Sequence, residues 1–231
     1  MERNHQSAAP KQRSRFRDAK GHSVSFGDLL VDLPRGVATA AALKLSGLAV
    51  LQPIISYPAL RLIRARLRST DRVLEYGSGR STVWLARQVR SVVSVEHHPE
   101  WRLKVAELLR EKELTDKVSY TFAETPETYV VPATANGEPF DFVFIDGMWR
   151  DKCVDRLPET LKPGGFVYLD DSDADCEPSR TDAEMRRAEC QLRAWAMRSN
   201  YVIVEATGFF PTGAHCKQGL FAFPGQNRSQ A

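Results

Sequence analysis

From residue 72 onward, short apolar runs alternate with longer amphipathic stretches, and this alternation restricts the chain to a small set of folds. Short runs rich in Val, Phe and Tyr are typical of strands, and the stretches between them are long enough for helices. Strands that alternate with helices form a parallel sheet covered on both faces. The predicted strands are 72–76, 91–96, 118–122, 140–146, 166–169, 201–206 and 220–223, and the predicted helices are 81–89, 100–112, 152–161 and 180–199.

The last two predicted strands depart from this alternation. The connection between them, residues 207–219, contains Gly208, Pro211 and Gly213 and is short for a helical crossover. A connection of this kind favours an antiparallel pair. We therefore expect an α/β fold with a doubly wound, seven-stranded, mostly parallel sheet whose last strand runs antiparallel.

Two segments precede the sheet. Residues 1–22 carry six Lys/Arg and two acids, whereas the whole chain has a net charge of +3, so the remainder is nearly neutral. Such a polar, basic segment favours a disordered tail. Residues 36–68 predict helices interrupted near Pro53 and Pro58. The predicted organisation is a basic tail at 1–22, a helical cap at 23–69, the α/β domain at 70–224 and a C-terminal tail at 225–231.

Charge and cysteine content indicate which classes of partner the protein binds and in which cellular compartment it is found. A nearly neutral folded part offers no electrostatic footprint for nucleic acid. The uncharged stretch 45–60 is short for a membrane span and contains two prolines, which favours a buried segment, although contact with a membrane surface stays open. The four cysteines have no metal-binding spacing, and the N-terminal residues lack the order of a signal peptide, so we expect a cytoplasmic protein with reduced thiols.

Acidic residues follow most of the predicted parallel strands. In open α/β sheets, ligands bind at the carboxyl ends of the strands, near the point where the strand order reverses. Carboxylates gathered at that edge suit a ligand with hydroxyls, amines or a bound cation. The acids at or near the strand ends are Glu75, Glu96, Glu124, Asp146, Asp170 and Asp171.

The sequence VLEYGSGRST at 73–82 places a glycine turn directly after the first strand. The dinucleotide-binding fingerprint needs a third small residue where Thr82 stands, and no Gly-Lys-Ser/Thr of a phosphate loop follows. A carboxylate at Glu75 would repel a pyrophosphate and favour a cationic ligand. Glu96 lies at the end of the second strand, where an acid binds the hydroxyls of a ribose. A ribose, a positive charge and no pyrophosphate together describe S-adenosylmethionine.

Four motifs in this order resemble class I S-adenosylmethionine-dependent methyltransferases: VLEYGSGRST, SVEHHPEW, DFVFIDG and LKPGGFVYLDDS. The resemblance covers roughly 70–224, and the wording EYGSGxST with IDGxxRxxC is similar to a group of small bacterial methyltransferases. It implies that Glu96 holds the ribose and that His97 lies beside the adenine. The cofactor-binding residues that it implies are Glu75, Tyr76, Gly77, Ser78, Gly79, Ser81, Thr82, Glu96, His97, Ala123, Glu124 and Asp146.

A cluster of carboxylates after the fourth and fifth strands is the second functional signal. Asp146, Asp170 and Asp171 would raise one another's pKa values unless a cation neutralised them, and oxygen ligands suit Mg²⁺. The arrangement resembles metal-dependent O-methyltransferases of small molecules, although Asp171 stands where the catechol type has Asn. The alternative is that these acids cap a loop and the next helix.

The sequence therefore predicts a methyltransferase that acts on a small molecule. A hydroxyl is the favoured acceptor and an amine the second choice, and Mg²⁺ is a candidate second cofactor. Its candidate catalytic residues are Asp146, Asp171 and Arg150; Arg150 would clamp an anionic substrate or form a loop ion pair. The alternatives are an NAD(P)-dependent oxidoreductase, an aminopropyltransferase on the same fold, and an inactive nucleoside-binding module. The methyl acceptor and the oligomeric state stay open.

Overall fold

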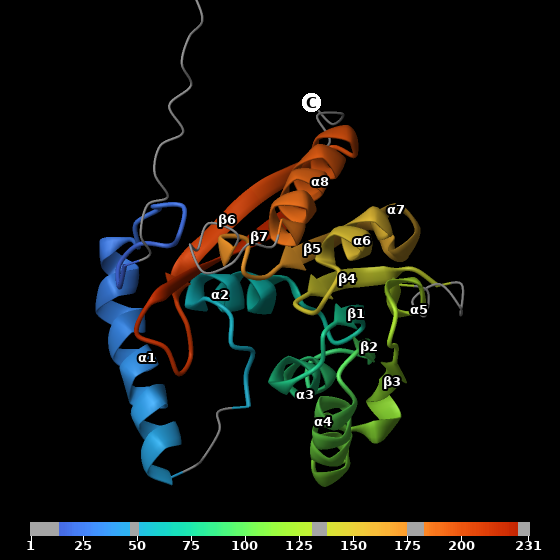
Figure 1. Ribbon diagram of the computed structural model, residues 1–231, viewed down its shortest axis with the longest axis horizontal. Helices are drawn as coiled ribbons and strands as arrows, with labels where there is room; N and C mark the ends of the chain where they lie inside the picture. Colours follow the sequence, from blue (N-terminus) through green and yellow to red (C-terminus); the bar gives the residue numbers. More distant parts are fainter. Residues whose placement is uncertain (1–13, 47–50, 131–137, 175–182, 226–231) are drawn as a thin grey trace, which may run out of the picture.

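The computed structural model describes residues 14–46, 51–130, 138–174 and 183–225, and its centre is a seven-stranded sheet (Figure 1). The strand order is β3-β2-β1-β4-β5-β7-β6, and β7 runs antiparallel to both of its neighbours. The predicted doubly wound sheet with an antiparallel last strand is confirmed. The strands are β1 (Arg72–Tyr76), β2 (Ser91–Glu96), β3 (Val118–Phe122), β4 (Phe140–Ile145), β5 (Leu161–Leu169), β6 (Tyr201–Phe209) and β7 (Cys216–Pro224).

Helices cover both faces of this sheet. Side chains alternate along each strand, so Val73 joins one apolar cluster and Leu74 joins the other. The first cluster contains α2 (Tyr57–Arg66), α3 (Arg80–Ala86) and α4 (Pro99–Glu111). The second contains α5 (Pro126–Val130), α6 (Arg150–Asp155), α7 (Leu157–Thr160) and α8 (Glu184–Arg198). A short 3₁₀ helix, η1 (Thr115–Lys117), precedes β3.

The order of the strands fixes where a ligand can bind. β1 pairs in parallel with β2 on one side and with β4 on the other, although β4 comes much later in the chain. The strand order therefore reverses at β1, with β2 and β3 on one side of it and β4 and β5 on the other. At such a reversal a crevice opens between the loops that follow β1 and β4, at the carboxyl ends of these strands. The residues that follow these two strands are those in which the sequence analysis placed its site.

Several predicted boundaries were wrong, and proline accounts for one of them. The helix predicted at 152–161 is divided into α6 and α7, because Pro158 lacks the N–H that a helix interior needs and instead occupies the first turn of α7. The strand predicted at 166–169 begins earlier, since Leu161 already pairs with Phe140 across a register shift. Helix α5 was not predicted, and residues 180–182 of the helix predicted at 180–199 lie outside the described residues.

The prediction that residues 1–22 form a disordered tail is wrong for 14–22, which contact the domain. Residues 1–13 lie outside the described part of the chain. Asp18 is fully buried, and its carboxylate accepts hydrogen bonds from Thr207 and Gln218 at 2.7 and 3.1 Å. The backbone N–H of Ala19 donates to Asp173 at 3.0 Å. Composition could not reveal these partners, because they come from β6, β7 and the loop after β5.

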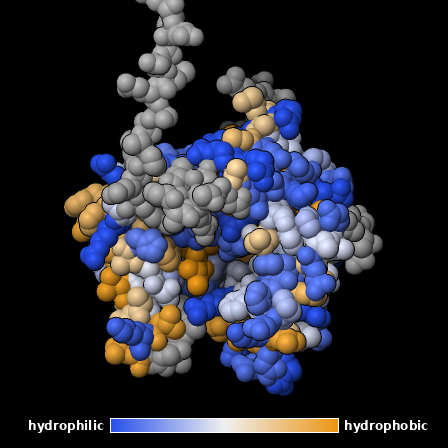
Figure 2. Space-filling view, in the orientation of Figure 1, coloured by the Kyte–Doolittle hydropathy of each residue, from blue (hydrophilic) through white to orange (hydrophobic). Residues whose placement is uncertain are grey.

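The N-terminal helices differ in how they meet the domain. Helix α1 (Phe26–Ser46) begins earlier than predicted and carries Pro34 within it, and α2 contributes Tyr57, Leu60 and Ile63 to the first apolar cluster. The boundary predicted at residue 70 therefore separates no independent core. No helix among the described residues is long and apolar enough to cross a membrane. Figure 2 shows hydrophobic side chains over α1, where the exposed ones are Phe26, Leu30, Val31, Val37 and Leu45.

Candidate active site

A cavity of about 590 Å³ opens at the carboxyl ends of β1, β2 and β4. A smaller one of about 200 Å³ shares Ser78, Trp101 and Asp146 with it. Eight of the predicted site residues line one or both cavities: Gly77, Ser78, Gly79, Ser81, Glu96, His97, Asp146 and Arg150. The predicted residues that line neither are Glu75, Tyr76, Thr82, Ala123, Glu124, Asp170 and Asp171.

The loops after β1 and β4 touch at Gly77 and Gly147. Gly77 has a φ of +92°, and a Cβ placed on it would lie 2.6 Å from the Cα of Gly147. A Cβ on Gly147 would in turn lie 2.0 Å from the Tyr129 hydroxyl oxygen. Only glycine fits at either position. This contact brings Asp146 next to the glycine loop, and the N–H of Asp146 donates to the carbonyl of Tyr76 at 2.9 Å.

Glu75 lies under the glycine loop and does not face the cavity. Its Oε2 accepts hydrogen bonds from the hydroxyls of Thr82 and Ser94 at 2.5 and 2.6 Å, and the N–H of Gly79 donates to Thr82 at 2.9 Å. Strand alternation directs Glu75 to the same face as Val73, which α3 covers. Burial raises the pKa of Glu75 to about 7. The prediction that this carboxylate lies beside a cationic ligand is therefore wrong for its orientation in the structure.

Glu96 is held in a fixed orientation at the end of β2. Oε2 accepts hydrogen bonds from the N–H and the hydroxyl of Ser78 at 3.1 and 2.7 Å. Oε1 accepts from the N–H groups of His97 and His98 at 2.9 and 2.8 Å. The Ser78 hydroxyl also lies 2.6 Å from that of Tyr120. A carboxylate fixed by backbone donors keeps its orientation when a ligand enters.

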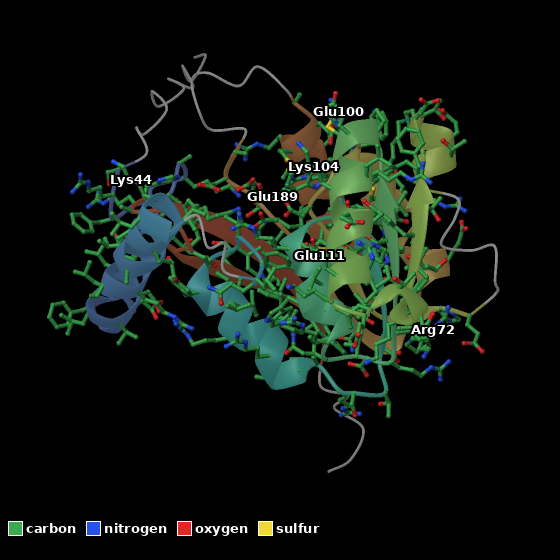
Figure 3. The ribbon with its side chains drawn as sticks, turned by 90° about the horizontal axis from the view of Figure 1, so that it is seen from below. Lys44, Arg72, Glu100, Lys104, Glu111 and Glu189 are labelled. Atoms are coloured by element: carbon green, nitrogen blue, oxygen red, sulfur yellow. The ribbon has the colours of Figure 1, made fainter. Side chains whose placement is uncertain are left out.

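The first turn of α4 forms a wall of the cavity that the sequence analysis missed. Trp101 is 43% exposed and donates its indole N–H to the carbonyl of Ser78 at 2.8 Å. Figure 3 shows Glu100 and Lys104 near the N-terminal end of α4 and Glu111 at its other end; Glu100 and Lys104 line the cavity. Trp101 lies in the helix predicted at 100–112 and was not among the predicted site residues. The signal for its role was Pro99, which starts the helix directly after β2.

An aromatic cluster stands behind His97. The ring centroids of His97, Tyr129 and Trp149 lie 5.3 to 6.4 Å apart, and Tyr76 stacks on Tyr129 at 5.6 Å. Trp149 has a φ of +49°, a left-handed conformation that is unusual for a bulky residue. Tyr76 and Ala123 are buried behind the cavity, and Glu124 is exposed outside it.

Asp146, Asp170 and Asp171 come together as predicted, with ligand oxygens within 4.8 Å of one another. Lys217 of β7 was not among the predicted site residues, because the last strand was predicted to begin at residue 220 and begins at Cys216. The Lys217 Nζ lies 2.5 Å from Oδ2 of Asp170 and 2.9 Å from Oδ1 of Asp171. It also donates to the carbonyl of Ile54 at 3.0 Å. A buried lysine therefore enters the centre of the acidic cluster.

Arg150 closes the other side of this cluster. Its guanidinium donates to the Asp146 carboxylate at 3.2 Å and to the backbone carbonyls of Asp146, Gly147 and Asp170. The loop ion pair, one of the two alternatives for Arg150, is thus present. Burial and the neighbouring Asp170 raise the pKa of Asp146. Burial alone would lower the pKa of Lys217, but the surrounding carboxylates raise it, so Lys217 is an ammonium.

The cluster as it stands does not fit a divalent metal. Asp170 has both carboxylate oxygens engaged, Oδ1 by the Tyr168 hydroxyl at 2.6 Å and Oδ2 by Lys217. Asp171 also accepts from Lys217. A metal would have to displace a buried ammonium to reach these oxygens. We therefore assign no step of the reaction to a metal.

Comparisons with known proteins agree with this fold. The model of a family described as a methyltransferase domain matches residues 74–172. The structure is similar to the O-methyltransferase TomG from Streptomyces achromogenes, involved in tomaymycin synthesis and solved with S-adenosylmethionine: TM-score 0.61 and 24% identity over 84% of this chain and 90% of that one. No curated protein matches the sequence.

Two further solved structures are similar. An O-methyltransferase from Bacillus cereus in complex with SAH has a TM-score of 0.59 and 18% identity over 83% of this chain and 90% of its own. Cofactor-bound Rv0187 from MTB has a TM-score of 0.55 and 24% identity over 87% of this chain and 95% of its own. Likeness at these identities establishes the architecture. This chain therefore has the Rossmann-like methyltransferase fold, and its residues 74–172 are similar to a methyltransferase domain.

Proposed function

We propose that this chain is an S-adenosylmethionine-dependent methyltransferase that methylates a hydroxyl group of a small molecule. The observation that carries the proposal is the Glu96 carboxylate, fixed by backbone donors at the end of β2 and facing the cavity that Gly77 opens. The O-methyltransferases of similar fold support the class of reaction.

Glu96 and Ser78 would bind the ribose. A ribose hydroxyl that donates to Oε2 of Glu96 must replace the Ser78 hydroxyl, which lies 2.7 Å from that oxygen. The Ser78 hydroxyl has a second partner in Tyr120 at 2.6 Å, so it can turn away without losing all of its hydrogen bonds. The exchange therefore leaves no buried polar group unpaired, which keeps its cost small.

The two ends of the proposed ligand have separate surroundings. His97 and the aromatic cluster behind it would flank the adenine, and the glycine loop would approach the methionine part. Asp146, which lines both cavities, would lie at the junction with the methyl acceptor. Glu75 has a different role from the one expected: it would hold the loop from beneath through Thr82.

When bound, S-adenosylmethionine supplies an electrophilic methyl group on a sulfonium. In transfer to an acceptor hydroxyl, the O–C bond would form as the S–C bond breaks, S-adenosylhomocysteine would leave, and the hydroxyl proton would pass to the Asp146 carboxylate that lines both cavities. Because this is a single displacement, alignment of the two partners supplies much of the rate enhancement. Asp146 and Arg150 line the part of the cavity where the acceptor would lie and are the proposed contacts for it. Asp171 lies behind them, paired with Lys217, and would act on the acceptor only through these neighbours.

Nicotinamide-dependent oxidation is the main rival, and the glycine loop argues against it. The position of the third glycine is filled by Thr82, whose hydroxyl is used within the loop. Isothermal titration calorimetry with S-adenosylmethionine, S-adenosylhomocysteine and NAD decides between them. We expect both sulfur nucleosides to bind and NAD to give no heat of binding. Binding of NAD alone would contradict the proposal.

A further inference from the structure

The ammonium of Lys217 occupies the place in the acidic cluster that a metal ion would need. Lys217 is 7% exposed, and its Nζ bridges Oδ2 of Asp170 and Oδ1 of Asp171 at 2.5 and 2.9 Å. Its third hydrogen bond goes to the carbonyl of Ile54 at 3.0 Å. All three donors of the ammonium thus have an acceptor, which is the arrangement that a buried charge requires.

The charges around this ammonium are nearly balanced. Asp170 and Asp171 bring two carboxylates against the two cations Lys217 and Arg150, and the pKa of the third carboxyl group, Asp146, is raised by burial and by Asp170. A divalent ion added to this set would make the net charge positive and would place a metal beside a buried ammonium. At these distances, in a partly buried site, such repulsion is large.

The backbone fixes Lys217 in this position from several sides. Strand β7 pairs with β6 along its whole length and with β5 only at residues 220–222. Lys217 lies before the part paired with β5, and its partner in β6 is Gly208. The next residue, Gln218, points into the polar contacts of the N-terminal segment: it donates to Asp18 at 3.1 Å, and its N–H donates to Asp173 at 3.1 Å. The β6–β7 register that places Gln218 in these contacts also places Lys217 next to Asp170 and Asp171.

We propose that Lys217 is the built-in cation of the carboxylate cluster formed by Asp146, Asp170 and Asp171, and that it excludes a divalent metal from this site. Lys217 is then a positioning residue, because it fixes Asp170 and Asp171 behind the proposed acceptor region. The catalytic meaning of this inference depends on the proposed methyl transfer, but metal exclusion can be measured without either substrate.

Binding of Mn²⁺, followed by the loss of the free-ion signal in electron paramagnetic resonance, tests the proposal on the full chain. We expect the wild-type protein to leave the signal unchanged at millimolar Mn²⁺. Lys217→Met removes the charge while keeping a long apolar side chain, and we expect its affinity for Mn²⁺ to be at least tenfold higher. Lys217→Arg keeps the charge and should bind no more Mn²⁺ than the wild type.

A second substitution locates any metal that binds. Asp171→Asn combined with Lys217→Met should lose the gained affinity. Wild-type protein that binds Mn²⁺, with binding lost in Asp171→Asn, overturns the proposal, and this comparison needs no Lys217 variant if Lys217→Met fails to fold. A folded Lys217→Met protein, checked by circular dichroism, that binds no more Mn²⁺ than the wild type also overturns it. The titration contains no S-adenosylmethionine, so its outcome is independent of the proposed function.

Discussion

The hydroxyl of Thr82 donates a hydrogen bond of 2.5 Å to the buried carboxylate of Glu75. The same hydroxyl accepts the N–H of Gly79 at 2.9 Å. Thr82 occupies the position that is glycine in dinucleotide-binding loops, and Glu75 is the acid that precedes the loop. The two departures from a phosphate-binding loop are thus one structural unit, in which the end of β1 is tied to the start of α3.

Thr82→Val removes this link with little change of shape. The buried Glu75 loses a donor and the N–H of Gly79 loses its acceptor, so we expect the free energy of unfolding to fall by about 1–3 kcal/mol. Urea denaturation measures the change. Thr82→Ser keeps the hydroxyl and should retain most of the stability; equal losses in both variants would mean that the methyl group, and not the hydrogen bonds, matters.

Glu75 predicts a specific pH dependence of stability. Burial raises its pKa to about 7 in the folded protein, above its ordinary value of 4.5. The folded state therefore binds this proton more tightly than the unfolded state, and the free energy of unfolding should fall as the pH rises from about 4.5 to 7, by up to about 3 kcal/mol from this group. Above pH 7 the contribution is constant.

Glu75→Gln isolates that contribution. Its amide cannot ionise, so the difference in unfolding free energy between Glu75→Gln and wild type should change across this pH range and level off above it. Denaturant titrations at intervals from pH 4.5 to 8 measure the difference. A difference that does not vary with pH would show that Glu75 has the same pKa in the folded and unfolded protein.

Glu96→Gln should weaken binding of S-adenosylhomocysteine. The amide NH₂ cannot accept the N–H groups that now donate to the carboxylate, and it accepts no ribose hydroxyl, so we expect a loss of about 10- to 100-fold, or about 1.4–2.8 kcal/mol. Calorimetric titration measures it. Glu111→Gln, at the far end of α4 (Figure 3), is the matched control and should bind as the wild type does. Unchanged binding in Glu96→Gln would remove the ribose assignment.

Asp18→Asn tests whether the N-terminal segment is part of the folded domain. Asp18 is fully buried, and its carboxylate accepts hydrogen bonds from His22, Thr207 and Gln218. The NH₂ of an asparagine is a donor, so at least one of these donors would lose its acceptor. We expect the free energy of unfolding to fall by about 1–3 kcal/mol. Asp116→Asn, an exposed position on η1, should change it by less than about 0.5 kcal/mol. Similar small effects in both would place Asp18 outside the cooperative unit.

Local patterns in the sequence predicted the sheet well and the helices less well. The bounds of β1, β2 and β3 agree with the prediction, because their β-branched and apolar residues form short continuous runs. The failures at α6, α7 and β5 have different causes. The division between α6 and α7 follows from Pro158, a local signal that the prediction overlooked, whereas the early start of β5 depends on pairing of Leu161 with Phe140 of β4.

The cavity-lining residues could be predicted where chain order alone brings them to the sheet edge. Gly77, Glu96 and Asp146 each lie at or next to the end of a parallel strand, and parallel strands present these ends together. Strand alternation gives the orientation of Glu75, since residues 73 and 75 of a strand point to the same face. Had the face shared with Val73 been considered, Glu75 would have been placed under the loop.

Hydrophobic periodicity and the residues at strand ends are local properties, so the class of fold and the edge at which the site lies could be predicted from the amino-acid sequence. The electrostatics of the site depend on contacts between distant residues that form only when the chain folds. Lys217 reaches Asp170 because β7 inserts between β5 and β6, and Asp18 is buried because Thr207 and Gln218 lie beside it. The residues of these pairs are 47 to 200 positions apart in the sequence, so local sequence patterns cannot predict which charged groups will be in contact.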